Sequence, residues 1–227
     1  MRGLFVTGTD TGVGKSVVAA TICAGLVKSG LRVAAFKPVV TGLDDPPGEW
    51  PPDHELLASV TGQEPGAVAP WLFGPPASPH LAAELDGVTL EPPELLAAAR
   101  RAGAWADALV CEGVGGLMVP LTPGYLVRDL ALDMRMPLVV AARPGLGTIN
   151  HTLLTLEAAR AAGLEPVAVV MTPWPSAPSH LEQSNRETVA RLGGVPVAAL
   201  PECTPESLAE AAASLPLADW LPSSEPG

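Results

Sequence analysis

The chain has 227 residues, of which 48% are hydrophobic and 16% are charged, so it is too apolar for intrinsic disorder and suits one folded domain. Its 24 acidic and 13 basic residues give a formal net charge of −11, which argues against nucleic acid or an anionic membrane as a partner. No apolar run approaches the roughly 20 residues of a membrane helix, no signal peptide is expected, and three scattered cysteines favour a reducing compartment, so we expect a cytoplasmic protein.

Short apolar runs alternate with helical patterns along the whole chain. Continuous apolarity in these runs is typical of strands that are covered on both faces. In chain order, we predict a strand at Leu4–Thr7, a helix at Ser16–Ser29, a strand at Arg32–Phe36, helices at Asp53–Val60 and Glu94–Ala102, a strand at Ala108–Cys111, a helix at Leu126–Asp133, a strand at Pro137–Ala142, a helix at Thr148–Ala161, a strand at Val167–Met171, a helix at His180–Leu192, a strand at Val195–Leu200 and a helix at Pro205–Ala213. Because parallel neighbours need crossover helices, this order predicts an α/β fold with a mainly parallel sheet and helices on both faces.

Proline and glycine crowd residues 42–52, 62–79 and 120–124. These stretches do not separate regions of different composition, so we interpret them as active-site loops rather than domain linkers. Ligands of such sheets bind at the carboxyl ends of the strands. We expect a single domain over residues 1–220 and a flexible tail over Leu221–Gly227.

Residues Gly8–Ser16 read GTDTGVGKS and lie directly between the first predicted strand and the first predicted helix. Such a context is typical of a phosphate-binding loop, in which Gly12 and Gly14 let backbone amides approach phosphate oxygens. Lys15 would reach the β- and γ-phosphates, and Ser16 would ligate Mg²⁺. The first glycine lies one residue too early for the usual spacing, and a glycine-rich turn with a solvated lysine is the alternative. Strand, loop and helix together predict a P-loop NTPase type of fold that binds a nucleoside triphosphate.

Three further residues have both a functional and an ordinary interpretation. Lys37 follows the second predicted strand and should emerge near the phosphate loop, although strands often end in a surface lysine. Glu112 ends the third apolar run, where P-loop proteins commonly place a carboxylate near Mg²⁺, and a helix-capping acid is the alternative. Asp53 begins a predicted helix, and taken alone it would be an N-cap.

Five segments occur together in an order typical of one family. They are GTDTGVGKS at 8–16, KPVVTG at 37–42, PASPH at 76–80, CEGVGG at 111–116 and GLGTINHTLLT at 145–155. With these segments the chain resembles the dethiobiotin synthetase family from about Gly3 to Cys203. The resemblance implies an ATP-dependent cyclo-ligase of biotin biosynthesis, which closes the ureido ring of dethiobiotin from 7,8-diaminononanoate and CO₂ through a carbamate and a carbamic-phosphoric anhydride.

The resemblance also implies roles for individual residues and a homodimer with its active sites at the interface. The implied catalytic residues are Lys37, Lys15 and Thr11, and the implied Mg²⁺ ligands are Ser16, Asp53 and Glu112. Nucleotide contacts are implied at Gly12, Val13, Gly14, Lys15, Ser16, Val17, Asp53, Glu112, Gly113, Val114, Gly115, Pro201, Glu202 and Cys203. Substrate contacts are implied at Thr41, Ser78 and Pro79, and at Gly147, Thr148, Ile149 and Asn150 across the dimer interface.

The sequence leaves an alternative co-substrate and an alternative function. Thr172-Pro173 stand where many family members carry an Asn that reads the adenine edge, so a nucleoside triphosphate other than ATP is a possible co-substrate. A partition-type ATPase switch of similar fold is the alternative function. Those switches usually carry an extra lysine early in the phosphate loop, and residues 8–14 contain none. The sequence therefore favours the synthetase.

Overall fold

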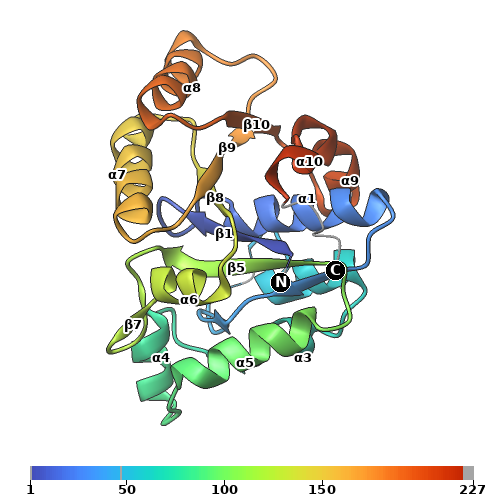
Figure 1. The fold of residues 1–227 in the computed structure, drawn as a ribbon, viewed down its shortest axis with the longest axis vertical. Coiled ribbons are helices and arrows are strands. Elements are labelled where there is room, and N and C mark those ends of the chain that lie inside the picture. Colours follow the sequence, from blue (N-terminus) through green and yellow to red (C-terminus); the bar gives the residue numbers. More distant parts are fainter. Residues whose placement is uncertain (1, 47, 222–227) are drawn as a thin grey trace.

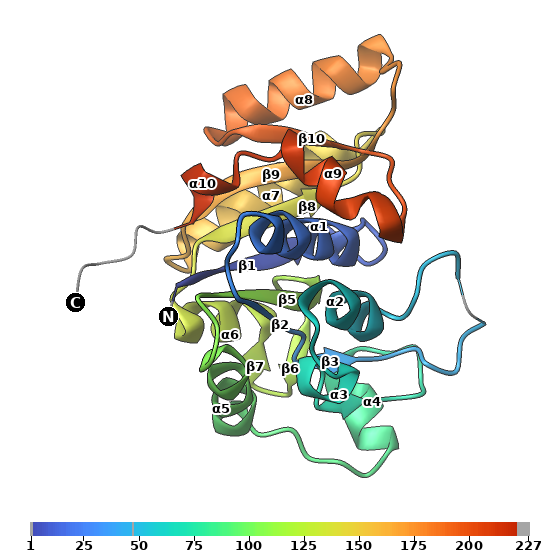
Figure 2. The same cartoon turned by 90° about the vertical axis from the view of Figure 1, so that its right-hand side faces the viewer.

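The computed structural model describes residues 2–46 and 48–221 and contains a central sheet of six strands. The strands are β1 (Gly3–Gly8), β2 (Val33–Phe36), β5 (Ala108–Gly116), β8 (Leu138–Ala142), β9 (Pro166–Trp174) and β10 (Val197–Pro201). Their order across the sheet is β10-β9-β8-β1-β5-β2, and every neighbouring pair is parallel (Figure 2). The six predicted strands and the predicted α/β architecture are confirmed.

Helices cover both faces of this sheet, as expected for parallel strands joined by crossovers. They are α1 (Lys15–Lys28), α2 (Asp53–Thr61), α3 (Pro65–Val68), α4 (Pro79–Leu85), α5 (Pro92–Gly103), α6 (Val127–Met134), α7 (Thr148–Ala161), α8 (His180–Gly193), α9 (Leu208–Ala211) and α10 (Leu217–Trp220), with 3₁₀ turns at Pro205–Ser207 and Ala212–Ser214. Two small sheets pair β3 (Val39–Val40) with β4 (Trp71–Leu72) in parallel, and β6 (Pro120–Thr122) with β7 (Tyr125–Leu126) in antiparallel fashion.

Successive side chains of the strands point alternately into two separate hydrophobic cores. In β1, Phe5 points to a core that is closed by α4, α5, α6, α7 and α8. Its neighbours Leu4 and Val6 point to the opposite core, which is closed by α1, α2, α9 and α10. Figure 1 shows α7 and α1 on opposite sides of β1 and β8. Both faces of the sheet are therefore covered by helices and shielded from solvent, which explains the continuous apolarity of the strand sequences.

Some short elements lie in segments that the sequence predicts as loops. The 62–79 stretch contains α3 and β4, and the 120–124 stretch contains β6. Helices α3 and α4 begin with Pro65 and Pro79, because proline suits the first position of a helix. The predicted helix Pro205–Ala213 is divided into a 3₁₀ turn, α9 and a second 3₁₀ turn. Strands of two or three residues are too short to show continuous apolarity, and helices of four to seven residues are too short to show a helical period.

The phosphate loop, Lys37 and Glu112 all lie at the carboxyl edge of the sheet. Residues 41–46, which follow β3, and residues 48–52, which precede α2, project from this edge (Figure 2). Within the described residues, no helix is long and apolar enough to cross a membrane. Leu221, the first residue of the predicted tail, is buried, and the rest of that predicted tail, residues 222–227, lies outside the described residues.

Candidate active site

The phosphate loop is a tight turn between β1 and α1. Gly12 has a φ of 70° and Gly14 a φ of 90°, a left-handed conformation that side chains other than glycine rarely adopt. A Cβ atom added at Gly14 would lie 2.7 Å from Cγ2 of Thr172, so the loop also packs closely against the end of β9. The backbone N–H of Thr9 donates to the carbonyl of Ala141 at 3.0 Å, which ties the loop to β8. The loop is thus held in one shape from two sides.

Lys15 folds back over its own loop. Its Nζ donates a hydrogen bond to the carbonyl oxygen of Asp10 at 2.8 Å, and the residue is only 7% exposed. Burial lowers the pKa of Lys15, and the nearby ammonium of Lys37 lowers it further. The ammonium therefore lies over the loop, where it can meet a phosphate that the loop amides bind.

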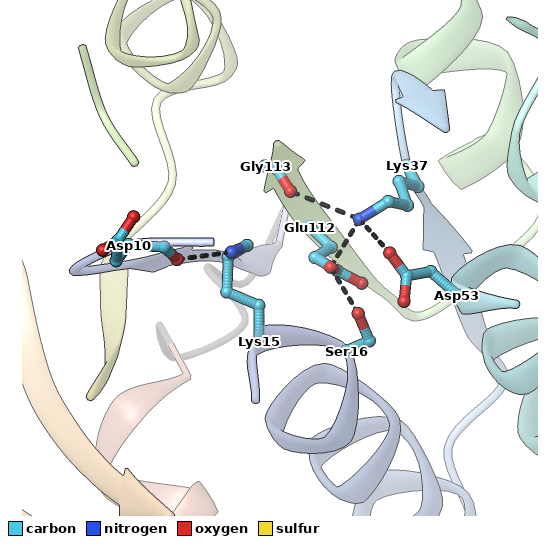
Figure 3. A network of polar contacts seen from close by, with 7 residues as sticks. All are labelled: Asp10, Lys15, Ser16, Lys37, Asp53, Glu112 and Gly113. Atoms are coloured by element: carbon cyan, nitrogen blue, oxygen red, sulfur yellow. Dashed lines mark hydrogen bonds and ion pairs between the residues drawn. The ribbon is translucent and has the colours of Figure 1, made fainter. Parts of the chain in front are cut away.

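Lys37 holds two carboxylates at once. Its Nζ lies 2.5 Å from Oε1 of Glu112 and 2.8 Å from Oδ2 of Asp53, and 3.5 Å from the carbonyl oxygen of Gly113. The hydroxyl of Ser16 donates to the same Oε1 of Glu112 at 2.8 Å. Figure 3 shows this network, in which Lys37 comes directly after β2, and β5 and the starts of α1 and α2 each contribute one further side chain.

The charges of the network follow from burial and proximity. Burial alone would lower the pKa of Lys37, but the charges of Asp53 and Glu112 outweigh burial and raise it. Burial would also raise the pKa of Asp53, but the Lys37 ammonium lowers it on balance. For Glu112, which is fully buried, burial prevails and raises the pKa. Lys37 is therefore a persistent cation and Asp53 a persistent carboxylate.

The oxygen donors of this network fit a magnesium ion. Oε2 of Glu112 is buried and, in the described part of the chain, has no hydrogen-bond partner. Mg²⁺ commonly takes one or two carboxylates and completes its octahedron with water and substrate phosphates. Ser16, Asp53 and Glu112 offer such a set beside the phosphate loop. Across residues 2–46 and 48–221, there is no group of three or more His, Cys, Asp or Glu side chains that could hold a metal ion.

A cavity of about 650 Å³, here called the reaction cavity, collects most of the predicted catalytic and substrate residues. The Lys37 side chain and the phosphate loop form one wall, and Thr41 and Ser78 come from connecting loops. Predicted residues that line it are Thr11, Gly12, Gly14, Lys15, Ser16, Val17, Lys37, Thr41, Asp53, Ser78, Pro79, Val114 and Gly115. These residues come from separate parts of the chain, at 11–17, 37–41, 53, 78–79 and 114–115, and the structure brings them to one cavity.

A second cavity of about 630 Å³, here called the nucleoside cavity, adjoins the first. It shares Gly12, Gly14, Val17 and Trp50 with the reaction cavity. The predicted residues Val13, Pro201, Glu202 and Cys203 line only the nucleoside cavity of this pair. Glu112 and Gly113 line neither cavity, and they reach the site through their contacts with Lys37.

The predicted substrate residues Gly147 to Asn150 lie apart from Lys37. Thr148 borders a separate cavity of about 200 Å³ together with Asp10, Arg143 and His151. Its hydroxyl lies 3.3 Å from that of Thr152, one helical turn further along α7. Within one chain, the structure does not bring residues 147–150 into the reaction cavity.

Several lining residues are absent from the sequence-based prediction. Trp50 and Glu49 come from the proline-rich segment before α2, and Thr204 follows β10. Arg143 follows β8, and its Nη2 donates to the carbonyl of Gly12 at 2.8 Å. The carboxyl-edge argument that singles out Lys37 also applies to Arg143, so a signal for it exists in the sequence. An isolated tryptophan in a loop carries no comparable signal.

Comparison with known proteins finds relatives over most of the chain. A family model described as an AAA domain matches residues 2–206. The ATP-dependent dethiobiotin synthetase BioD of Anoxybacillus flavithermus is 38% identical over 199 residues, which cover 87% of this chain and 90% of that protein. The proteins of the same name from Anaeromyxobacter sp. strain Fw109-5 and Bacillus subtilis are 40% and 36% identical, over 86% and 87% of this chain and 91% and 85% of their own lengths. Among solved structures, chloroplast FtsY from Physcomitrella patens matches with a TM-score of 0.48 and 15% identity, covering 92% of this chain and 64% of that chain.

Proposed function

The chain belongs to the dethiobiotin synthetase family of ATP-dependent ligases and carries the AAA domain, and from this membership we propose the reaction and the role of each site residue. One amine of 7,8-diaminononanoate adds to CO₂ and loses a proton, which gives a carbamate. A carbamate oxygen attacks the γ-phosphorus of ATP, and ADP leaves. The second amine then attacks the carbonyl carbon and displaces phosphate, which closes the ureido ring.

Lys37 is the observation that carries the proposal. Phosphoryl transfer needs positioned positive charge more than a strong base, because negative charge develops on the oxygens around the transferred group. Lys37 is a buried cation at the mouth of the phosphate loop, held by Asp53 and Glu112. We assign it to the carbamate and the γ-phosphate, and Lys15 to the β- and γ-phosphates. Thr11, which lines the same cavity, faces these phosphates.

Magnesium belongs to this proposal as the nucleotide's counter-ion. Ser16, Asp53 and Glu112 would hold it, and it would neutralise charge on the β- and γ-phosphate oxygens. The unpaired Oε2 of Glu112 supports this assignment. When nucleotide and metal bind, Lys37 has to give up part of its contact with the two carboxylates, which frees its N–H groups for the carbamate.

Thr41, Ser78 and Pro79 are the proposed contacts of the diamine. They line the reaction cavity on the side of the connecting loops. The Ser78 hydroxyl lies 3.0 Å from Nδ1 of His80, so its orientation is constrained. Hydroxyl oxygens at Thr41 and Ser78 suit amine N–H donors.

We further propose a homodimer in which residues 147–150 of one subunit meet the substrate tail bound by the other. The backbone N–H of Thr148 donates to the carbonyl of Gly145 at 3.3 Å, and the other first-turn amides of α7 suit a carboxylate. Leu146, directly before this helix start, is 92% exposed, and Leu154 on α7 is 56% exposed. An apolar surface of this kind supports an interface at α7.

The remaining assignments follow from the same membership. We take residues 1–220 as one synthetase domain, and we place the protein in the cytoplasm, where its three free cysteines would remain reduced. The partition-type switch is not favoured, because the relatives named above are synthetases.

Phosphate release with and without diamine tests the proposed function. Purified protein is incubated with Mg²⁺, bicarbonate and ATP, CTP or GTP, and dethiobiotin is followed by mass. We expect phosphate and dethiobiotin to form together and only with the diamine present. Phosphate release without diamine and without product would instead support an ATP-driven switch.

A further inference from the structure

Arg143 stands beside the phosphate loop on the side opposite Lys37. It follows β8, which neighbours β1 on one flank, whereas Glu112 lies within β5 on the other flank. Its Nη2 donates to the carbonyl oxygen of Gly12 at 2.8 Å, across 131 positions of sequence. This contact turns the guanidinium toward the loop, although the residue as a whole is exposed.

The charges around the nucleoside cavity make this position unusual. Among the described residues that line that cavity, the acidic side chains are Glu49 and Glu202, and Arg143 is the only cation. Lys15 and Lys37 line the reaction cavity instead. The chain also carries a net charge of −11, so an anionic nucleotide needs local positive charge. The end of the triphosphate next to the ribose has no other cationic side chain on the lining of its cavity.

The geometry of a guanidinium suits this task. It offers five N–H donors in a planar fork, of which the contact with Gly12 uses one. Arginine binds phosphate oxygens through charge-assisted and often bidentate hydrogen bonds. Gly12 and Gly14 line both cavities. A phosphate chain that runs from the nucleoside cavity to the reaction cavity therefore crosses these two glycines and lies beside Arg143.

We propose that Arg143 binds the α-phosphate of the nucleotide while it fixes Gly12 of the phosphate loop. The proposal rests on the nucleotide site assigned above and adds a third cationic side chain to it. Lys15 and Lys37 serve the phosphates at the reacting end, and Arg143 serves the phosphate next to the ribose. It is a nucleotide-binding and positioning residue, because it does not touch the transferred phosphoryl group.

Binding measurements without diamine test this role separately from catalysis. Dissociation constants of ATP, AMP and adenosine are measured with the full chain by competition against a fluorescent ATP analogue. Arg143→Gln should weaken the binding of ATP and AMP by about tenfold or more, the usual loss when one charged hydrogen-bond donor is removed. The dissociation constant of adenosine should stay unchanged. Arg143→Lys keeps the positive charge and should lose less affinity for ATP than Arg143→Gln.

Arg160→Gln is the matched control, because Nη2 of Arg160 donates to the carbonyl of Gly193 at 2.5 Å, away from the cavities. It should leave ATP binding unchanged. Thermal midpoints without nucleotide verify that each variant folds. The proposal would be overturned if wild type and Arg143→Gln bound ATP with equal affinity. It would also be overturned if Arg143→Gln lost as much affinity for adenosine as for ATP, or if Arg143→Lys lost as much affinity for ATP as Arg143→Gln. Wild-type dethiobiotin synthesis is measured in parallel, so a failure of the proposed function would be seen independently.

Discussion

Lys37 illustrates how a buried charge is kept inside this molecule. The residue is 3% exposed, and an unpaired ammonium at such a position would cost several kcal/mol. Asp53 and Glu112 offset that cost and leave the lysine charged. The same two contacts hold the Lys37 ammonium in a fixed position at the phosphate loop. The stability of the fold and the proposed phosphoryl transfer therefore depend on the same ion pairs.

Lys37→Ala is expected to lower kcat for dethiobiotin formation by about 10²–10³, the typical effect of removing one charged partner of a transition state. The substitution also leaves Asp53 and Glu112 without their shared cation, so the thermal midpoint should fall. Lys28→Ala is the control, because that lysine lies at the exposed end of α1. Turnover and thermal unfolding are measured on both. Wild-type turnover in Lys37→Ala would remove Lys37 from the mechanism.

Glu112→Gln tests the proposed magnesium set. The amide preserves size and one acceptor oxygen but removes the charge that Mg²⁺ would meet. We expect the Mg²⁺ concentration for half-maximal nucleotide binding to rise by about tenfold or more, since even outer partners of metal ligands change affinity by that factor. Titration with Mg²⁺ at fixed ATP measures it. An unchanged half-saturation would exclude Glu112 as a ligand.

Residue-level prediction succeeds where strand order alone brings residues together. Ser16 and Lys37 follow β1 and β2, and Glu112 lies within β5, the strand between those two, so the carboxyl-edge rule brings them into one site. Their pairing does not follow from the sequence: that Lys37 bonds both carboxylates, and that Ser16 shares one oxygen with it, depends on side-chain rotamers. The Gly12 contact of Arg143 is non-local for the same reason.

At the scale of elements, α1 organises one of the two cores. Ten of its residues are buried, and it packs against α2 on one side and the C-terminal helices on the other. It has little amphipathic pattern, because both flanks and the sheet face are covered. Gly25 lies where α1 comes closest to the C-terminal segments. A Cβ there would meet Cβ of Ala212 and Cδ1 of Leu217, each at 2.7 Å.

Gly25→Ala should therefore lower the thermal midpoint, although alanine is the better helix former by about 1 kcal/mol. Overpacking at a site this tight costs about 1–3 kcal/mol, and we expect a net loss of roughly 1 kcal/mol. Gly66→Ala in α3 is the matched control, since nothing lies within 4 Å of its added Cβ. Thermal and urea unfolding compare the two. A Gly25→Ala protein as stable as wild type would show that α1 can shift away from the C-terminal helices.

Strands of four or more residues and helices of eight or more could be predicted, whereas strands of two or three residues and helices of four to seven could not. The strand at Pro137–Ala142 and the helix at Thr148–Ala161 are long enough to show continuous apolarity or a helical pattern, and both are confirmed within one residue. Elements such as β3 and α4 have two and seven residues, and tertiary packing decides their conformation.

In the whole molecule, acidic residues outnumber basic ones, but the candidate site gathers several cations. The chain as a whole carries −11, while Lys15, Lys37 and Arg143 gather at one edge of the sheet. In the proposed function, these three cations bind the phosphates against the negative charge of the chain as a whole. The proposed dimer belongs to the same scale, because residues 147–150 do not line the reaction cavity of their own chain.

Leu146→Lys tests the proposed dimer. A charge at a 92% exposed leucine costs the folded monomer little, but it would be buried in an interface at α7. We expect sedimentation to show a monomer and dethiobiotin synthesis to fall by about tenfold or more. Leu192→Lys, at a 55% exposed leucine near the end of α8, should leave both unchanged. A Leu146→Lys dimer with full activity would place the interface elsewhere.

The fate of a bicarbonate oxygen tests the central claim, that this site phosphorylates a carbamate. Protein, Mg²⁺, ATP and 7,8-diaminononanoate are mixed with ¹⁸O-labelled bicarbonate, and the phosphate formed in the first minutes is analysed by mass. Because a carbamate oxygen attacks the γ-phosphorus and leaves with it, each phosphate should carry one ¹⁸O from bicarbonate. Unlabelled phosphate here, together with label from H₂¹⁸O in the converse experiment, would mean simple ATP hydrolysis and would contradict the account.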